Sequence, residues 1–178
     1  MITIYLIRHG KTSWNKENLI QGTKDIPLSP EGRKEVTELA QKINLNKIDL
    51  ILSSPQKRAK ETAKIIDNNK KTILYNNLLK ERNFGSYEGT KTSEELINKL
   101  WDYNLNYQDE NIESITVCLN RAANFLKEIK TKYPNKNILI ISHGAFIKAI
   151  HYNINGYDKN TNFLSFNPQN ATIYKYEL

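Results

Sequence analysis

Three segments of the chain place histidine and arginine side chains directly after a run of apolar residues. They are Arg8-His9-Gly10, Ser53-Ser54-Pro55 with Arg58 one turn further on, and Ser142-His143-Gly144. In open α/β sheets, ligands bind outside the carboxyl ends of the strands. Helices that begin at this edge add free backbone N–H groups, and arginine binds phosphate oxygens in a bidentate manner. The pattern therefore predicts an anion site, with phosphate as the natural ligand.

The two histidines suggest a division of labour in phosphoryl transfer. One imidazole has to be neutral to attack phosphorus, and positive surroundings favour that form. The other, if charged, would stabilise the transition state together with the arginines. The leaving alkoxide needs a proton, and residues 79–89 offer two carboxylic acids for this step, Glu81 and Glu88.

Local patterns indicate which elements bring these segments together. Nearly continuous runs of Ile and Leu predict buried parallel strands at 2–7, 48–52 and 138–141. Amphipathic helices are predicted to begin at Ser29-Pro30 and at Pro55, to span 115–129, and to begin again near Gly144. This alternation of strand and helix predicts an α/β fold, a three-layer sandwich with a mostly parallel sheet flanked by helices.

The last part of the chain is predicted to add an antiparallel edge strand. Two apolar-rich stretches, 163–166 and 172–176, flank turn-forming residues at 167–170. This arrangement is typical of a hairpin.

The middle of the chain is predicted to cover the anion site. Thr92-x-x-Glu95 can cap a helix that runs to about Tyr103, and the polar residues 104–111 predict a loop. We expect residues 82–114 to act as a lid and specificity segment within a single domain of residues 1–178.

The composition is typical of a soluble globular protein, with 39% apolar and 25% charged residues among 178. No apolar run approaches the ~20 residues that span a bilayer, and no basic region precedes the apolar start. We therefore expect no membrane partner and no signal peptide, and a cytoplasmic location by default. The net charge of +7 attracts anions. The lysines are scattered, which disfavours nucleic acid as a partner, and the single cysteine excludes an intrachain disulfide.

Five segments in order resemble the histidine phosphatase superfamily, in its phosphoglycerate mutase-like branch. They are Ile7-Arg8-His9-Gly10-Lys11-Thr12-Ser13-Trp14-Asn15, Gly22-Thr23-Lys24-Asp25-Ile26-Pro27-Leu28-Ser29-x-x-Gly32, Ser53-Ser54-Pro55-x-x-Arg58-Ala59-x-x-Thr62-Ala63, Glu81-x-x-x-Gly85-x-x-Glu88-Gly89, and Ser142-His143-Gly144. A lone Arg-His-Gly is a weak signal, whereas five ordered segments that cover the chain are a specific one.

The resemblance implies a role for each matched residue. His9 corresponds to the nucleophile that becomes phosphohistidine, and Glu81 to the proton donor that later activates water. Arg8, Arg58 and His143 correspond to the groups that hold the phosphoryl oxygens. Further contacts to phosphate or pocket positions are implied for Asn15, Gly144, Thr12, Gln21, Gly22 and Thr23. Members of this kind use no metal and no other cofactor.

The departures from the family pattern favour a phosphatase acting on small phosphorylated metabolites. Mutases that resemble this family carry a longer insertion between the positions of Glu81 and His143, with basic residues for the substrate carboxylate. This chain lacks that insertion. The alternatives are a cofactor-dependent phosphoglycerate mutase, an α-ribazole phosphate phosphatase, and a non-catalytic module that binds phosphorylated ligands. The sequence leaves the oligomeric state, monomer or homodimer, open.

Four residues outside the matched positions receive structural interpretations. We expect His151 to be a packing or surface residue and Cys118 to lie in the core. Arg82 is expected to pair with an acid on the surface, the alternative being a contact with the substrate, and Arg121 to be solvated on its helix.

Overall fold

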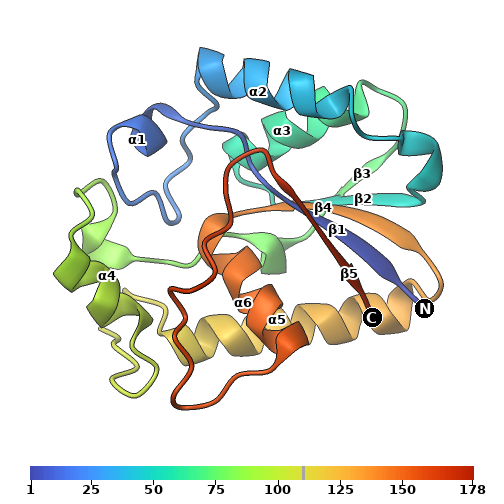
Figure 1. The fold of residues 1–178 in the computed structure, drawn as a ribbon. Helices are drawn as coiled ribbons and strands as arrows, with labels where there is room; N and C mark the ends of the chain where they lie inside the picture. The colour runs from blue at the N-terminus through green and yellow to red at the C-terminus, as the bar shows by residue number, and fades with distance from the viewer. Residues whose placement is uncertain (110) are drawn as a thin grey trace.

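The computed structural model describes residues 1–109 and 111–178, and in them a five-stranded sheet forms the centre of the fold (Figure 1). Its strands are β1 (Thr3–Arg8), β2 (Leu50–Ser53), β3 (Ile73–Tyr75), β4 (Asn137–Ser142) and β5 (Ile173–Glu177). Their order across the sheet is β3-β2-β4-β1-β5. The pairs β3–β2, β2–β4 and β4–β1 are parallel, and β5 is antiparallel to β1. The predicted mostly parallel sheet with an antiparallel edge strand is confirmed.

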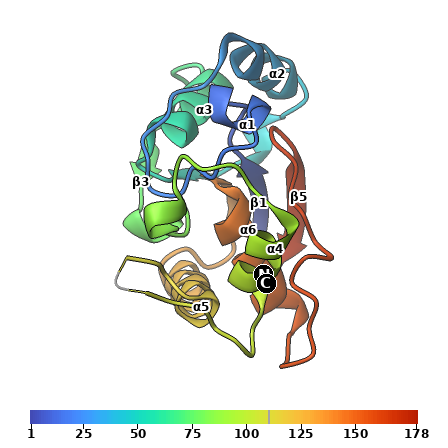
Figure 2. The same ribbon diagram turned by 90° about the vertical axis from the view of Figure 1, so that its left-hand side faces the viewer.

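Helices cover both faces of this sheet, as Figures 1 and 2 show. On one face lie α2 (Pro30–Ala40) and α3 (Lys57–Asp67), and on the other α5 (Ile115–Lys132) and α6 (Gly144–Asn155). Each face has its own hydrophobic cluster, because successive side chains of a strand point to opposite faces. Leu6 and Ile140 belong to the α5–α6 side, whereas Ile7 and Ile141 belong to the α2–α3 side. The three-layer sandwich is therefore confirmed.

The helix starts follow from local chemistry. Ser29 caps α2, since its Oγ accepts the N–H of Gly32 at 3.0 Å, and Pro30 fits the first turn. The second predicted helix, α3, begins at Lys57, two residues after Pro55, with Gln56 as its N-cap. The side chain of Gln56 makes no cap bond, and the site described below uses it instead.

Short helices lie in the segments between the main elements. They are α1 (Ser13–Lys16), α4 (Glu94–Trp101) and the 3-10 turns η1 (Leu45–Lys47), η2 (Asn77–Leu79) and η3 (Gly85–Tyr87). Ser93, and not Thr92, caps α4, and the helix ends at Trp101 rather than near Tyr103. Residues 104–109 form the predicted loop, whose residue 110 lies outside the described part of the chain.

The predicted C-terminal hairpin is wrong in its first strand. Residues 163–166 form no strand, because Phe163 is buried among aromatic rings, 4.6 Å from Tyr152 and 5.8 Å from Tyr103 between centroids. The second stretch alone pairs with β1, as β5. The sequence patterns also missed β3, a three-residue edge strand in which Leu74 and Tyr75 are exposed.

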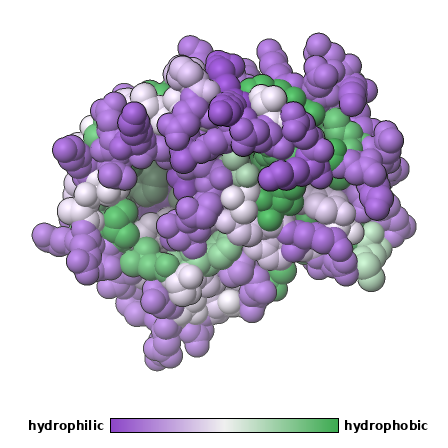
Figure 3. All heavy atoms as spheres, turned by 45° about the horizontal axis from the view of Figure 1, so that its top comes forward, coloured by the Kyte–Doolittle hydropathy of each residue, from purple (hydrophilic) through white to green (hydrophobic). Residues whose placement is uncertain are grey.

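The face of the molecule shown in Figure 3 is largely covered by hydrophilic side chains. Among the described residues, no helix combines the length and the apolar character that crossing a membrane requires.

Candidate active site

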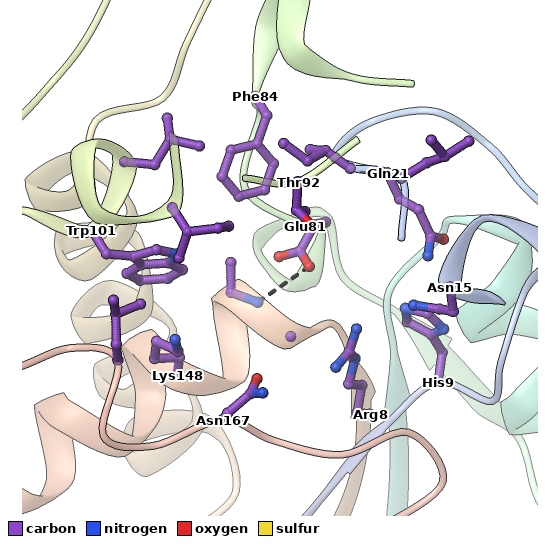
Figure 4. Close-up of a pocket in the computed structure, with 18 residues that line it drawn as sticks. Arg8, His9, Asn15, Gln21, Glu81, Phe84, Thr92, Trp101, Lys148 and Asn167 are labelled. Atoms are coloured by element: carbon purple, nitrogen blue, oxygen red, sulfur yellow. Dashed lines mark hydrogen bonds between the residues drawn. The ribbon is translucent and has the colours of Figure 1, made fainter. Parts of the chain in front are cut away.

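A cavity of about 410 Å³ opens where β1 ends and α6 begins, and Figure 4 shows the side chains around it. Arg8 and His9 reach it from the end of β1, and Gly144 and Lys148 from α6. The remaining wall is formed by residues 19–22, by α4 and by the tail near Asn167. The parallel strands thus bring together groups that are far apart in sequence, as expected for the carboxyl edge of an α/β sheet.

His9 is buried and held in one tautomer. Its Nδ1 lies 2.7 Å from the carbonyl oxygen of Gly10, which can only accept, so Nδ1 carries the proton. Its Nε2 therefore has the lone pair, and it accepts the Nε–H of Arg58 at 3.2 Å. Burial, with the nearby charges of Arg58 and Arg8, holds the pKa of His9 well below 6.5. At neutral pH, His9 is a neutral imidazole with an available nitrogen lone pair.

Arg58 connects three parts of the site from the first turn of α3. Its Nε lies 3.1 Å from Nδ1 of His143 as well as near His9, so one N–H is shared between two rings. Its Nη1 donates to the carbonyl oxygen of Lys24 at 2.7 Å, and its Nη2 to that of Gly22 at 2.8 Å. Burial lowers its pKa to about 10. Arg58 is fully buried and does not line the cavity.

His143 stands at the N-cap of α6, behind His9. The two ring centroids are 5.2 Å apart. Because Nδ1 of His143 accepts from Arg58, Nε2 carries its proton, which it donates to Oγ of Ser54 at 2.8 Å. Burial and the charge of Arg58 hold the pKa of His143 well below 6.5. Both imidazoles thus favour the neutral form, and a bound anion beside them would raise both pKa values.

Arg8 presents a donor to the cavity. Its Nη1 donates to the carbonyl oxygen of Pro168 at 2.8 Å, while its Nε is buried and has no hydrogen-bond partner among residues 1–109 and 111–178. A Cβ at position 144 would lie 3.2 Å from Cζ of Arg8, so Gly144 allows the guanidinium to lie against the start of α6. Burial lowers the pKa of Arg8. In the described part of the chain this Nε–H has no partner, and Arg8 lines the cavity.

Of the two candidate carboxylates, Glu81 lines the cavity and Glu88 does not. The Oε2 of Glu81 accepts the N–H of Ala145 at 3.2 Å, the bond dashed in Figure 4, and its Oε1 accepts the N–H groups of Arg82 and Phe146. Glu81 is thereby fixed at the N-terminus of α6. Glu88 instead accepts the backbone N–H of Thr23 at 2.7 Å and so braces the loop around Gly22.

The other predicted pocket residues divide into two groups. Asn15, Gln21 and Gly22 line the cavity, and Oδ1 of Asn15 is occupied by the N–H of Thr12 at 3.0 Å, which leaves the Nδ2 donors free for a ligand. Thr12 and Thr23 lie outside the lining. Thr12 caps α1, which places Asn15, and Thr23 bonds to Glu88.

Three residues of the site, Gln56, Trp101 and Lys148, were not predicted from the sequence. Gln56 joins the two sides of the site, since its Nε2 donates to the carbonyl oxygen of Gly22 at 3.0 Å and its Oε1 accepts the N–H of Glu81 at 2.8 Å. Lys148 and Trp101 form the end of the cavity away from His9 (Figure 4). A signal for Lys148 was its spacing, four residues after Gly144 on the same helix face.

The interpretations of Arg82 and Arg121 are wrong. Arg82 is fully buried, and it donates to the carbonyl oxygens of Leu100 and Glu113, both at 2.7 Å. Arg121 forms an ion pair with the half-buried carboxylate of Glu113 at 2.8 Å and donates to the carbonyl oxygen of Leu78. Apart from the carboxylate of Glu113, these partners are backbone carbonyls, which single-sequence patterns do not reveal.

The other two interpretations are confirmed. The ring of His151 stacks on Phe166, 3.9 Å between centroids, and its Nδ1 lies 2.8 Å from the hydroxyl of Tyr176. Cys118 is buried in the core, and burial raises its pKa to about 12. In the part of the chain that the structure describes, no cluster of three or more His, Cys, Asp or Glu could hold a metal ion.

Sequence comparisons find relatives of this chain over most of its length. The model of the histidine phosphatase superfamily (branch 1) matches residues 4–178. A protein named uncharacterized phosphatase PhoE, from Bacillus subtilis (strain 168), is 36% identical over 159 residues, which is 89% of this chain and 80% of that one. Phosphoserine phosphatase 1 from Hydrogenobacter thermophilus is 27% identical over 179 residues, 97% of this chain and 84% of that one.

A comparison with solved structures also finds phosphatases. The crystal structure of a phosphoserine phosphatase mutant from Entamoeba histolytica, in complex with phosphoserine, matches with a TM-score of 0.87 at 31% identity, over 98% of this chain and 90% of that one. The chain therefore belongs to the histidine phosphatase superfamily, branch 1, and is a phosphatase of this type.

Proposed function

We propose that this phosphatase hydrolyses small phosphorylated metabolites through a phosphohistidine on His9, without a metal ion. The observation that carries the proposal is the state of His9. Its Nδ1–H donates to the carbonyl oxygen of Gly10. Its neutral Nε2 therefore has a lone pair, at the end of the cavity where Arg8 and Asn15 converge. A neutral, oriented imidazole is what nucleophilic attack on phosphorus requires.

In the first step, the lone pair of His9 Nε2 forms a bond to phosphorus while the bond from phosphorus to the leaving oxygen breaks. Glu81 gives its proton to that oxygen, so the alcohol leaves neutral. In the second step, Glu81 takes a proton from water, the oxygen of that water bonds to phosphorus, and the P–N bond breaks. Phosphate leaves, and His9 and Glu81 return to their starting forms.

In this proposal, side chains and the start of α6 neutralise the negative charge of the phosphoryl group as it is transferred. Arg8 offers its guanidinium, Asn15 its amide, and α6 its N-terminal backbone at Gly144. Arg58 now donates to the lone pair that would attack, so it has to exchange this bond for one to a phosphoryl oxygen when substrate binds. Phosphoryl transfer depends mainly on such positioning and charge neutralisation.

Substrates are proposed from the relatives and the cavity together. Two of the proteins named above are phosphoserine phosphatases, and one was solved with phosphoserine bound. A cavity of about 410 Å³ suits a small metabolite. Phosphoserine, 3-phosphoglycerate, sugar phosphates and α-ribazole phosphate form the panel to be tested.

We also propose that residues 1–178 form one domain, with 82–114 as the specificity segment. Phe84, Leu100 and Ile112 of this segment pack with Ile20 and Ala145 in a third hydrophobic cluster that lines one side of the cavity. Arg82 donates hydrogen bonds to the carbonyl oxygens of Leu100 and Glu113 within this segment. Any closing motion of the segment as a lid would therefore be confined to the residues between these contacts.

The first experiment is hydrolysis of p-nitrophenyl phosphate with EDTA present, for the wild type and His9→Ala, followed by the panel. Turnover that survives EDTA and is lost in the variant supports the proposal. Isomerisation of 3-phosphoglycerate without release of phosphate would identify a mutase instead. Binding of these compounds with no turnover at all would identify a binding module.

A further inference from the structure

The end of the cavity away from His9 is built around one lysine. Figure 4 shows Lys148 and Trp101 at this end, His9 and Asn15 at the other, and Arg8 and Glu81 between them. Lys148 comes from α6, Trp101 from the last residue of α4, and Asn167 from the tail before β5. Three separate elements thus converge there.

Lys148 is a buried cation without a protein anion. It is 5% exposed, and its Nζ lies 4.2 Å from the centroid of the Trp101 ring. No hydrogen bond or ion pair of its ammonium group is found with another residue in 1–109 or 111–178. The nearest carboxylate that affects it is Glu81, whose oxygens already accept three backbone N–H groups. Burying a charge is unfavourable unless the charge is paired, so a ligand anion would supply what the fold lacks.

The charges around Lys148 also favour an anionic ligand. Burial and the positive charge of Arg8 lower its pKa to about 8, with Arg82 acting in the same direction and Glu81 against it. An anion placed at this end of the cavity would offset both effects and favour the ammonium form.

We propose that Lys148 is the receptor for a carboxylate on the substrate, which makes the substrate class phosphomonoesters of small hydroxy or amino acids. The inference rests on the proposed function, because the phosphate has to occupy the end formed by His9 and Arg8. A carboxylate fits this end of the cavity better than a second phosphate does. It carries one negative charge, which the single ammonium of Lys148 can balance while the amide of Asn167 donates a hydrogen bond. A phosphate usually recruits the fork of an arginine. Arg8 is assigned to the phosphate end, and Arg82 does not line the cavity, because it donates to the carbonyl oxygens of Leu100 and Glu113.

The test uses two substrates that differ in the carboxylate alone. 3-Phosphoglycerate and glycerol 3-phosphate carry the same ester, with a carboxylate in the first and a hydroxymethyl group in the second. We expect the wild type to favour 3-phosphoglycerate in kcat/KM, through KM. Lys148→Met should reduce that ratio roughly 10- to 100-fold, the range for a hydrogen bond to a charged group. Lys148→Arg should restore most of it.

Lys99→Met is the matched control. Lys99 also lies over an aromatic ring, 3.7 Å from the centroid of Tyr107, but it does not line the cavity. Its substitution should leave the ratio unchanged. Thermal unfolding of each variant checks that the fold is retained.

Each other outcome overturns one proposal. A wild type that hydrolyses both substrates equally, or a Lys148→Met variant with an unchanged ratio, overturns the carboxylate receptor and leaves the phosphatase mechanism intact. A wild type that hydrolyses neither these two substrates nor p-nitrophenyl phosphate overturns the mechanism. Calorimetric binding of the two compounds then decides the receptor, which is overturned if Lys148→Met does not reduce the preference for 3-phosphoglycerate.

Discussion

The Nε of Arg58 lies 3.2 Å from Nε2 of His9, so the atom that we propose as the nucleophile accepts a hydrogen bond from a fully buried arginine. The guanidinium is fixed in turn by the carbonyl oxygens of Gly22 and Lys24. One side chain therefore sets the direction of the lone pair and the path of the loop that faces it.

Arg58→Lys should lower kcat/KM by roughly 100- to 1000-fold, because a lysine cannot reach the two imidazoles and the two carbonyls at once. The variant should also unfold at lower urea concentration, since each unpaired buried carbonyl costs about 1–3 kcal/mol. Arg33→Lys is the control, because Arg33 is half exposed and pairs with Glu61. A full-activity Arg58→Lys enzyme would contradict the arrangement.

His9→Ala should abolish turnover and the phosphorylated intermediate together. Wild-type enzyme quenched during turnover of a labelled substrate is expected to carry acid-labile phosphate, as a phosphohistidine does. His151→Ala should still form it, because His151 stacks on Phe166 away from the cavity. Label retained by His9→Ala would place the nucleophile elsewhere.

Glu81→Gln should slow substrates with poor leaving groups most, because an amide cannot donate the proton that an alkoxide needs. p-Nitrophenolate leaves without a proton, so its release should be affected far less than that of an alkyl alcohol. The measurement compares single-turnover rates for p-nitrophenyl phosphate and an alkyl phosphate. Equal slowing of both would remove Glu81 from the acid role.

The lowered pKa values of His9 and His143 predict a loss of stability in acid. Below the ordinary value of 6.5, the unfolded chain binds protons that the folded chain does not. The free energy of unfolding should then fall as the pH falls from 6.5, by up to about 1.4 kcal/mol per pH unit for each histidine. Urea unfolding between pH 7 and 5 measures this slope.

Replacing both histidines by glutamine should flatten the slope. A smaller dependence should remain from His151, whose pKa is also lowered by burial. A double variant with the slope of the wild type would show that other groups govern the acid transition.

Elements with local signals could be predicted from the order of residues alone. Runs of Ile and Leu marked β1, β2 and β4, and the cap at Ser29-Pro30 marked the start of α2. Because parallel strands end at one edge of a sheet, the strand pattern also predicted that the segments after them meet there. His9 and Arg58 accordingly lie in contact at this edge.

Which polar groups are buried, and what they contact, depends on the packing of distant segments. Arg82 is enclosed because the carbonyls of Leu100 and Glu113, distant in sequence, converge on it, and Lys148 faces the cavity because α4 and the tail close around it. Residues 163–166 do not form the predicted hairpin strand, because Phe163 packs in an aromatic cluster instead. Burial and pairing depend on long-range contacts, which a local pattern of residues does not contain.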